Sequence, residues 1–125
     1  MKNEESVVSI VDDDLLVREA IGDLVNSLGY EVITFKSAED FLRSGQLART
    51  ACVIADLQMP GLSGLDLLER LLADGYDAIR VILVTAYPRP EARERAFNSG
   101  AIAFLSKPFE EMSLISAVRL ALQPS

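Results

Sequence analysis

Carboxylates, one hydroxyl and one ammonium stand at the ends of separate apolar runs in this chain of 125 residues. They belong to Asp12 and Asp13, to Asp56, to Thr85 and to Lys107. Such groups in one crevice could transfer a phosphoryl group, because a carboxylate can attack phosphorus while fixed donors hold the phosphoryl oxygens. If the runs are parallel strands, these side chains meet at the carboxyl edge of one sheet, where open α/β sheets bind ligands.

The residue types suggest a chemical role for each of these side chains. Asp56 is the candidate nucleophile, because it follows an apolar run directly and precedes a loop. A carboxylate and a phosphoryl group repel each other, so a cation is needed; Asp12 and Asp13 supply the oxygen ligands that suit Mg²⁺. The ammonium of Lys107 and the hydroxyl of Thr85 can then contact the transferred group.

Each residue also has a structural interpretation when it is taken alone. One of the three consecutive acids could cap the helix that follows, and Asp14 is the candidate for that role. Asp56 could be a turn residue, Thr85 a β-branched strand residue and Lys107 a solvated charge. The site is therefore predicted from their joint arrangement at successive strand ends, which is far less expected by chance than any single member.

Short runs rich in Val and Ile alternate with longer segments of helical period, which predicts five βα units. The predicted strands are residues 7–11, 31–35, 51–55, 80–84 and 102–106. The predicted helices cover about 17–28, 37–44, 64–74, 90–100 and 111–122. Strict alternation indicates one α/β domain over residues 1–125, a doubly wound parallel sheet with helices on both faces.

Composition narrows the class of protein. Twelve basic against nineteen acidic side chains give a net charge of −7, which disfavours direct binding to nucleic acid or to an anionic membrane. The single cysteine, Cys52, can form no internal disulfide and fits a reducing compartment. The first residues lack the apolar core of a signal peptide, and no run approaches the roughly 20 apolar residues of a membrane span. We therefore expect a cytoplasmic protein.

Four segments carry a family resemblance: residues 11–14 (VDDD), 55–61 (ADLQMPG), 84–86 (VTA) and 105–109 (LSKPF). In order and spacing they resemble the motifs of receiver domains of bacterial two-component response regulators. The resemblance implies a flavodoxin-like receiver fold with five strands in the order 2-1-3-4-5. It also implies a phosphorylation-activated signalling switch. Segments 59–64 and 99–104 are similar to the FixJ-like regulators, whose receivers are joined to a helix-turn-helix output domain.

The resemblance assigns roles around the metal. It implies that Asp56 accepts a phosphoryl group from a sensor histidine kinase in a phosphorelay. Mg²⁺ would be bound by Asp13, by Asp56 and by the main-chain carbonyl of Gln58, while Asp12 assists through water.

The resemblance also assigns the switch. Thr85 and Lys107 would contact the phosphoryl group, and the bond between Lys107 and Pro108 would be cis. Phe104 takes the position of the switch aromatic, which turns inward when Thr85 is drawn toward the phosphate. Phe104 is equally well interpreted as a core aromatic of the last strand.

The expected output is transcription, with any output domain beyond residue 125. The predicted last helix has an apolar stripe containing Leu114 and Val118, and a second stripe in which Ile115 and Leu122 flank Arg119. An apolar stripe left exposed implies a partner. We expect phosphorylation-promoted homodimerisation through the fourth helix, fifth strand and fifth helix, as is common in the family.

Three alternatives remain open at this stage. The chain could be a stand-alone phosphotransfer or interaction receiver without a DNA-binding output. It could be a hydrolase with an aspartyl-phosphate intermediate, but such enzymes carry Asp-x-Asp on one loop and this chain has Gln58 after Asp56. It could also be a receiver-like module that takes no phosphate. Beyond its own phosphorylation and dephosphorylation we expect no enzymatic activity.

Overall fold

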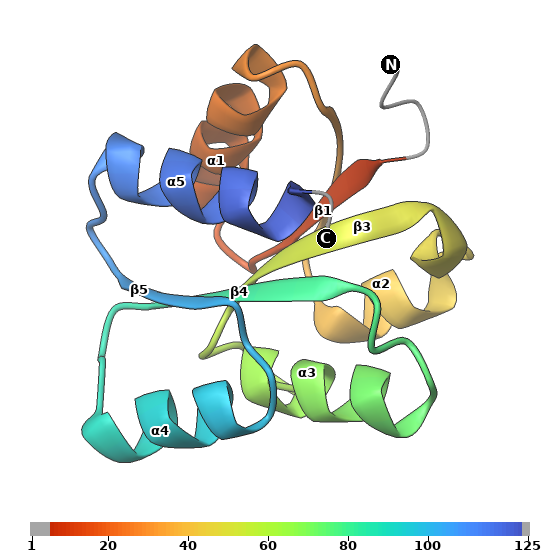
Figure 1. The fold of residues 1–125 in the computed structure, drawn as a ribbon, viewed down its shortest axis with the longest axis vertical. Coiled ribbons are helices and arrows are strands. Elements are labelled where there is room, and N and C mark those ends of the chain that lie inside the picture. The colour runs from red at the N-terminus through yellow and green to blue at the C-terminus, as the bar shows by residue number, and fades with distance from the viewer. Residues whose placement is uncertain (1–5, 124–125) are drawn as a thin grey trace.

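Five strands and five α-helices alternate along residues 6–123, the part of the chain that the computed structural model describes (Figure 1). The strands are β1 (Val7–Val11), β2 (Glu31–Phe35), β3 (Thr50–Asp56), β4 (Arg80–Thr85) and β5 (Ala103–Ser106). The helices are α1 (Leu15–Ser27), α2 (Ala38–Arg43), α3 (Gly64–Ala73), α4 (Pro90–Asn98) and α5 (Glu111–Leu122). A short 3₁₀ helix, η1 (Leu47–Arg49), lies between α2 and β3 and was not predicted.

All four strand pairs are parallel, and the sheet order is β2-β1-β3-β4-β5. The predicted α/β fold and strand order are confirmed. Because β1 pairs with β2 on one side and with β3 on the other, the strand order reverses between β1 and β3. The carboxyl ends of these two strands therefore border the crevice in which open α/β sheets bind ligands.

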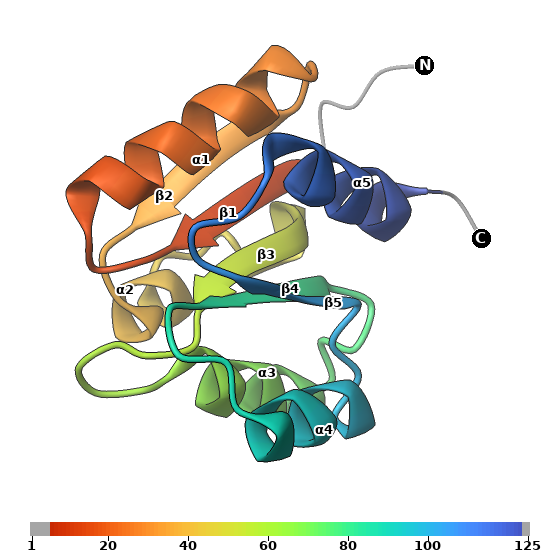
Figure 2. The ribbon, with the colours of Figure 1, turned by 90° about the vertical axis from the view of Figure 1, so that its left-hand side faces the viewer.

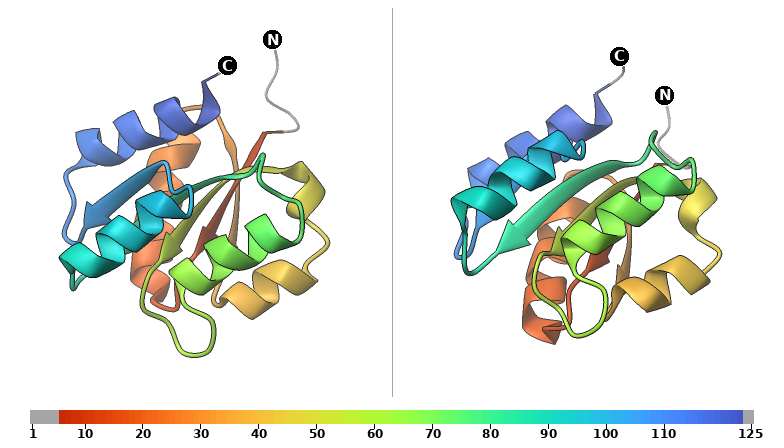
Figure 3. Two further views of the ribbon diagram at one scale, coloured as in Figure 1. Left: turned by 60° about the horizontal axis from the view of Figure 1, so that its bottom comes forward. Right: turned by 90° about the horizontal axis from the view of Figure 1, so that it is seen from below.

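Helices cover both faces of the sheet. Figure 2 shows α1 and α5 on one face, and Figure 3 looks onto the opposite face, which is covered by α2, α3 and α4. Side chains of β3 alternate between the two cores: Cys52 and Ile54 pack with α1 and α5, whereas Val53 and Ala55 pack with the other three helices. Burial on both faces explains why the central strands are nearly continuous apolar runs.

Side-chain caps determine where three helices begin. The carboxylate of Asp14 accepts hydrogen bonds from the N–H groups of Leu16 (3.0 Å) and Val17 (3.4 Å), so its predicted role as the cap of α1 is confirmed. Ser37 caps α2, and Ser63 forms a capping box on α3. These caps satisfy main-chain N–H groups that have no partner within the first turn of each helix.

The strand bounds differ slightly from the predicted ones. β3 extends to Asp56 because Asp56 still pairs with Val84 of β4. β4 extends to Thr85 because Thr85 still pairs with Ser106 of β5. β5 begins at residue 103 rather than 102. Residues 1–5 and 124–125, part of the predicted 1–125 domain, lie outside the described residues. Within 6–123, every helix is too short or too polar to cross a membrane.

Candidate functional site

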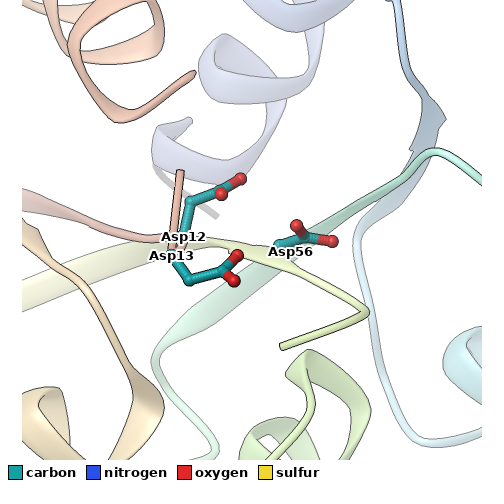
Figure 4. A group of neighbouring side chains, drawn as sticks. All are labelled: Asp12, Asp13 and Asp56. Atoms are coloured by element: carbon teal, nitrogen blue, oxygen red, sulfur yellow. The ribbon is translucent and has the colours of Figure 1, made fainter. Parts of the chain in front are cut away.

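The three predicted acids meet at the carboxyl edge of the sheet. β1 and β3 pair in parallel with Val11 opposite Ala55, so Asp12, directly after β1, lies beside Asp56, the last residue of β3. Asp13 is the next residue along the chain, and one carboxylate oxygen from each acid lies within 4.8 Å of the others. Figure 4 shows the three side chains gathered beside these strand ends. The structure thus brings together residues 44 positions apart, as the topology predicts.

Lys107 joins this group from the far edge of the sheet. Its ammonium donates hydrogen bonds to Asp12 Oδ2 and to Asp56 Oδ2, both at 3.0 Å. Its main-chain N–H donates to the carbonyl of Thr85 at 2.8 Å, which fixes the start of the loop after β5. The bond between Lys107 and Pro108 is cis, as the resemblance implied. One cation therefore bridges two of the three acids.

Burial sets the electrostatics of the site. Asp12 and Asp56 are only 2% and 8% exposed, whereas Asp13 is exposed. Burial raises the pKa of Asp12, and hydrogen bonds from the Asp14 N–H and from Lys107 offset only part of that rise. Burial alone would lower the pKa of Lys107, but the hydrogen bonds and charges of Asp56 and Asp12 outweigh it and raise that pKa. The lysine is therefore charged, and it is the one cation that contacts the carboxylates of these three acids within the described residues.

The donor set fits Mg²⁺. Carboxylates of Asp12, Asp13 and Asp56 are hard oxygen ligands, and their excess negative charge favours a second cation beside Lys107. The N–H of Gln58 donates to Asp56 Oδ1 at 2.9 Å, which ties the following loop to the acid. The carbonyl of Gln58 as a further ligand stays a prediction.

Thr85 lies next to this group and is fully buried. Its Oγ1 accepts a hydrogen bond from the Tyr87 N–H at 3.1 Å. The hydroxyl proton does not take part in that bond and can be donated to another acceptor. Phe104 is not part of the acid cluster. It is half-buried, packs against the core under α2, α3 and α4, and borders a hollow of about 410 Å³ with Pro88 and Arg93.

Gly64 supports the site in a way that sequence reasoning missed. It begins α3, and a Cβ at this position would lie 2.6 Å from the main-chain oxygen of Asp56 and 3.0 Å from Leu83 Cδ2. Only a glycine lets the helix approach the end of β3 so closely. The sequence signal was present as a glycine at the first helical position, where it was interpreted only as a helix start.

An apolar hollow of about 510 Å³ lies beside Lys107. It is formed by one side of α1 and by the loop after β5, with the lining residues Leu16, Val17, Ala20, Ile21, Ala86, Lys107, Pro108 and Phe109. Leu16 is 75% exposed and is the most exposed large apolar side chain in the described part of the chain. The acid cluster therefore has an apolar surface next to it.

Comparison with known proteins gives a consistent result. A family described as the response regulator receiver domain matches residues 8–119. The chain is 44% identical over 124 residues to response regulator protein TmoT of Ectopseudomonas mendocina, which covers 98% of this chain and 56% of that protein. It is 39% identical over 119 residues to transcriptional regulatory protein FixJ of Azorhizobium caulinodans, covering 95% of this chain and 56% of FixJ.

Solved structures agree. The structure of response regulator StyR superposes with a TM-score of 0.86 at 41% identity, covering 94% of this chain and 59% of that chain. The chain thus spans about half the length of the relatives TmoT, FixJ and StyR.

Proposed function

The chain belongs to the response regulator receiver domain family, and from that premise we propose that it is a phosphorylation-activated switch whose Asp56 accepts a phosphoryl group. A receiver of this kind is a signalling domain rather than a classical enzyme. One observation carries the proposal: the ammonium of Lys107 lies 3.0 Å from both Asp12 and Asp56, beside the exposed Asp13. This arrangement holds a buried nucleophile next to a cation and leaves excess negative charge for a metal.

The phosphoryl donor is the phosphohistidine of a sensor histidine kinase. A carboxylate oxygen of Asp56 attacks phosphorus, the P–N bond breaks, and its electron pair returns to the imidazole, which takes up a proton. Asp56 becomes an acyl phosphate. Mg²⁺ held by Asp13, Asp56 and the Gln58 carbonyl, with Asp12 assisting through water, would neutralise charge on the phosphoryl oxygens. Lys107 moves from bridging two carboxylates to holding a phosphoryl oxygen.

Thr85 and Phe104 form the switch in this proposal. The Thr85 hydroxyl can donate its proton in a hydrogen bond to the phosphoryl group. As it moves toward the phosphoryl group, its hydrogen bond from the Tyr87 N–H would break. Phe104 has a hollow of about 410 Å³ beside it, which gives its ring room to change position. The charge change at Asp56 would thereby reach the surface of α4 and β5.

We place the kinase on the apolar hollow between α1 and the loop after β5. This surface lies next to Lys107, so a partner seated on it can present a phosphohistidine to Asp56. Leu16→Glu should slow transfer from a purified, autophosphorylated histidine kinase about tenfold, because it puts a charge into an apolar contact. Phosphorylation by acetyl phosphate should not change. Leu120→Glu, at an exposed leucine of α5, is the matched control. Equal slowing with both phosphoryl donors would contradict this placement.

The whole protein is proposed to control transcription in the cytoplasm, where the free thiol of Cys52 stays reduced. TmoT and FixJ are about twice the matched length, and FixJ is named a transcriptional regulatory protein. The receiver itself would not bind nucleic acid, given its charge of −7. The alternative is a stand-alone phosphotransfer receiver.

Phosphorylation is proposed to promote homodimerisation through α4, β5 and α5. On α5, Ile115 and Leu122 are half-buried and Arg119 is exposed. Phe104 belongs to β5, the strand that connects α4 to α5 along the chain. Sedimentation of the domain with and without beryllium fluoride tests this. A mass increase that Ile115→Glu removes supports the face, and an increase that survives the substitution argues against it.

The central experiment is phosphoryl incorporation. Incubation with acetyl phosphate and Mg²⁺ should add one phosphoryl group by intact mass, and Asp56→Asn should abolish the addition. The variant should keep its fold, because the change is nearly isosteric and removes one of three mutually repelling acids. Removal of Mg²⁺ with a chelator should also stop incorporation. Undiminished incorporation in Asp56→Asn would overturn the assignment, and continuous turnover of phosphate would favour the hydrolase alternative.

A further inference from the structure

The loop between β3 and α3, residues 57–63, carries the proposed metal ligand Gln58, and its apolar side chains Met59 and Leu62 pack against the core under α2, α3 and α4. At its start, the Leu57 N–H donates to the Val84 carbonyl at 2.8 Å and the Gln58 N–H to Asp56. At its end, Ser63 belongs to the capping box of α3. Within the described part of the chain, residues 59–62 make one hydrogen bond, and it goes to another element.

That bond goes to Glu39, in the first turn of α2. Glu39 Oε2 accepts the Leu62 N–H at 3.0 Å, across 23 positions in the sequence. The same oxygen lies against Gly61, whose φ is +79°, and a Cβ at Gly61 would collide with it. Figure 2 shows the loop passing next to α2. The carboxylate therefore holds Leu62 by a hydrogen bond and lies directly against Gly61.

An ordinary role in helix capping does not account for this contact. An acid in the first turn is favourable near the positive end of a helix, and Asp40 beside it also fills that role. That effect needs no contact with a distant loop. The Leu62 N–H is the largest cause that lowers the pKa of Glu39, so the carboxylate stays ionised and the bond is charge-assisted.

We propose that Glu39 is a positioning residue for Mg²⁺ binding at the acid cluster. By holding Leu62 and lying against Gly61, it helps to fix the path of the loop that carries the Gln58 carbonyl. Glu39 itself does not touch the metal. The inference rests on the proposed function, since it assumes that a metal binds at this edge of the sheet.

The first test needs no metal. Amide hydrogen exchange of Leu62, measured by NMR on the metal-free chain, should be about tenfold faster in Glu39→Ala, because its only partner is lost. Glu39→Gln keeps an acceptor oxygen and should stay near the wild type. Asp40→Asn is the matched control, because that neighbouring acid pairs only with the exposed Arg43. It should leave Leu62 unchanged.

The second test links the contact to the metal. By calorimetry, Glu39→Ala should bind Mg²⁺ about tenfold more weakly, a typical effect of removing a group that orients a ligand. Its phosphorylation by acetyl phosphate should be slow at low Mg²⁺ and reach the wild-type rate at saturating Mg²⁺. Glu39→Gln should restore most of the affinity. Gly61→Ala should also weaken Mg²⁺ binding, because its Cβ displaces the carboxylate and its positive φ strains the loop.

The outcomes separate the two proposals. Wild-type Leu62 exchange in Glu39→Ala, or faster exchange with unchanged Mg²⁺ affinity, overturns the positioning role. Equal losses in Glu39→Ala and Asp40→Asn would also overturn it, because the effect would then be one of general charge. If the wild-type chain neither binds Mg²⁺ nor accepts a phosphoryl group, the proposed function fails, whatever Leu62 shows.

Discussion

Two buried polar groups lie on the same pair of neighbouring strands and differ in their charge balance. Inside the sheet, Ser9 of β1 and Thr50 of β3 share a hydrogen bond of 2.9 Å. At the carboxyl edge a few residues further on, Asp12 and Asp56 share the ammonium of Lys107. Both groups are largely hidden from solvent, so burial alone does not distinguish them.

The difference is in what each group leaves unsatisfied. Thr50 donates its hydroxyl to the Gln46 carbonyl at 2.8 Å and accepts from Ser9, so both hydroxyl protons are used. The neutral pair is complete without a ligand. The edge cluster has three acids and one lysine, and burial opposes the ionisation of Asp12. Excess negative charge at this edge supports the proposed phosphoryl-transfer site, because a structure built for stability alone has no reason to keep it.

The largest effect is expected from Lys107→Ala, which removes the only positive charge that contacts the carboxylates of Asp12 and Asp56 within the described residues. Some phosphorylation should remain, because bound metal still neutralises charge. The conformational response should be lost, because the link from the phosphoryl group to the end of β5 is gone. Amide shift changes on phosphorylation, measured by NMR, check this, with Lys36→Ala, an exposed lysine after β2, as control. A wild-type response in the phosphorylated variant would contradict it.

The second largest effect concerns the metal. Asp13→Ala should weaken Mg²⁺ binding about tenfold, and Asp12→Ala by less, if the first acid coordinates directly and the second through water. Titration calorimetry measures both. The comparison sharpens with Ser9→Ala, which should bind Mg²⁺ like the wild type. Equal affinities for the two aspartate variants would contradict their separate roles.

A smaller effect is expected at the neutral pair. Ser9→Ala should lower the free energy of unfolding by about 1 kcal/mol, the usual net value of one hydrogen bond. Thr50→Val should cost more, because it removes two hydrogen bonds: Ser9 loses its partner, and the Gln46 carbonyl keeps only the Arg49 N–H. Urea unfolding gives these values, and phosphorylation should stay normal. A loss of phosphorylation at wild-type stability would mean that the neutral pair belongs to the site.

The smallest effect at neutral pH is expected at Cys52, a neutral buried group of β3. Burial raises the pKa of its thiol to about 12, so alkylating reagents should leave the folded protein unmodified at pH 8 and react only after unfolding. The unfolded thiol ionises near 9.0 and therefore binds fewer protons than the folded one above that pH. Stability should thus fall as the pH rises from 9 toward 12. Rapid native-state alkylation would show that β3 opens.

Local patterns in the sequence predicted most of the elements. Short apolar runs identified every strand within residues 6–123, and the period of about 3.6 identified every α-helix there. Asp14 was identified as a cap from its position. The strand ends at Asp56 and Thr85 were misjudged by one residue, because pairing with a neighbouring strand continues past the apolar run. Helix η1 was missed, since three residues carry no periodic signal.

By itself, the sequence determined which groups could do chemistry and that they follow successive strands, because residue type and local period are written along the chain. Only the tertiary structure decided their partners. It places the Lys107 ammonium 3.0 Å from Asp12 and Asp56. It also forms the hydrogen bonds between Ser9 and Thr50 and between Leu62 and Glu39. These contacts join residues 23 to 95 positions apart, and they form because the order of strands in the sheet, rather than proximity along the chain, sets which loops meet.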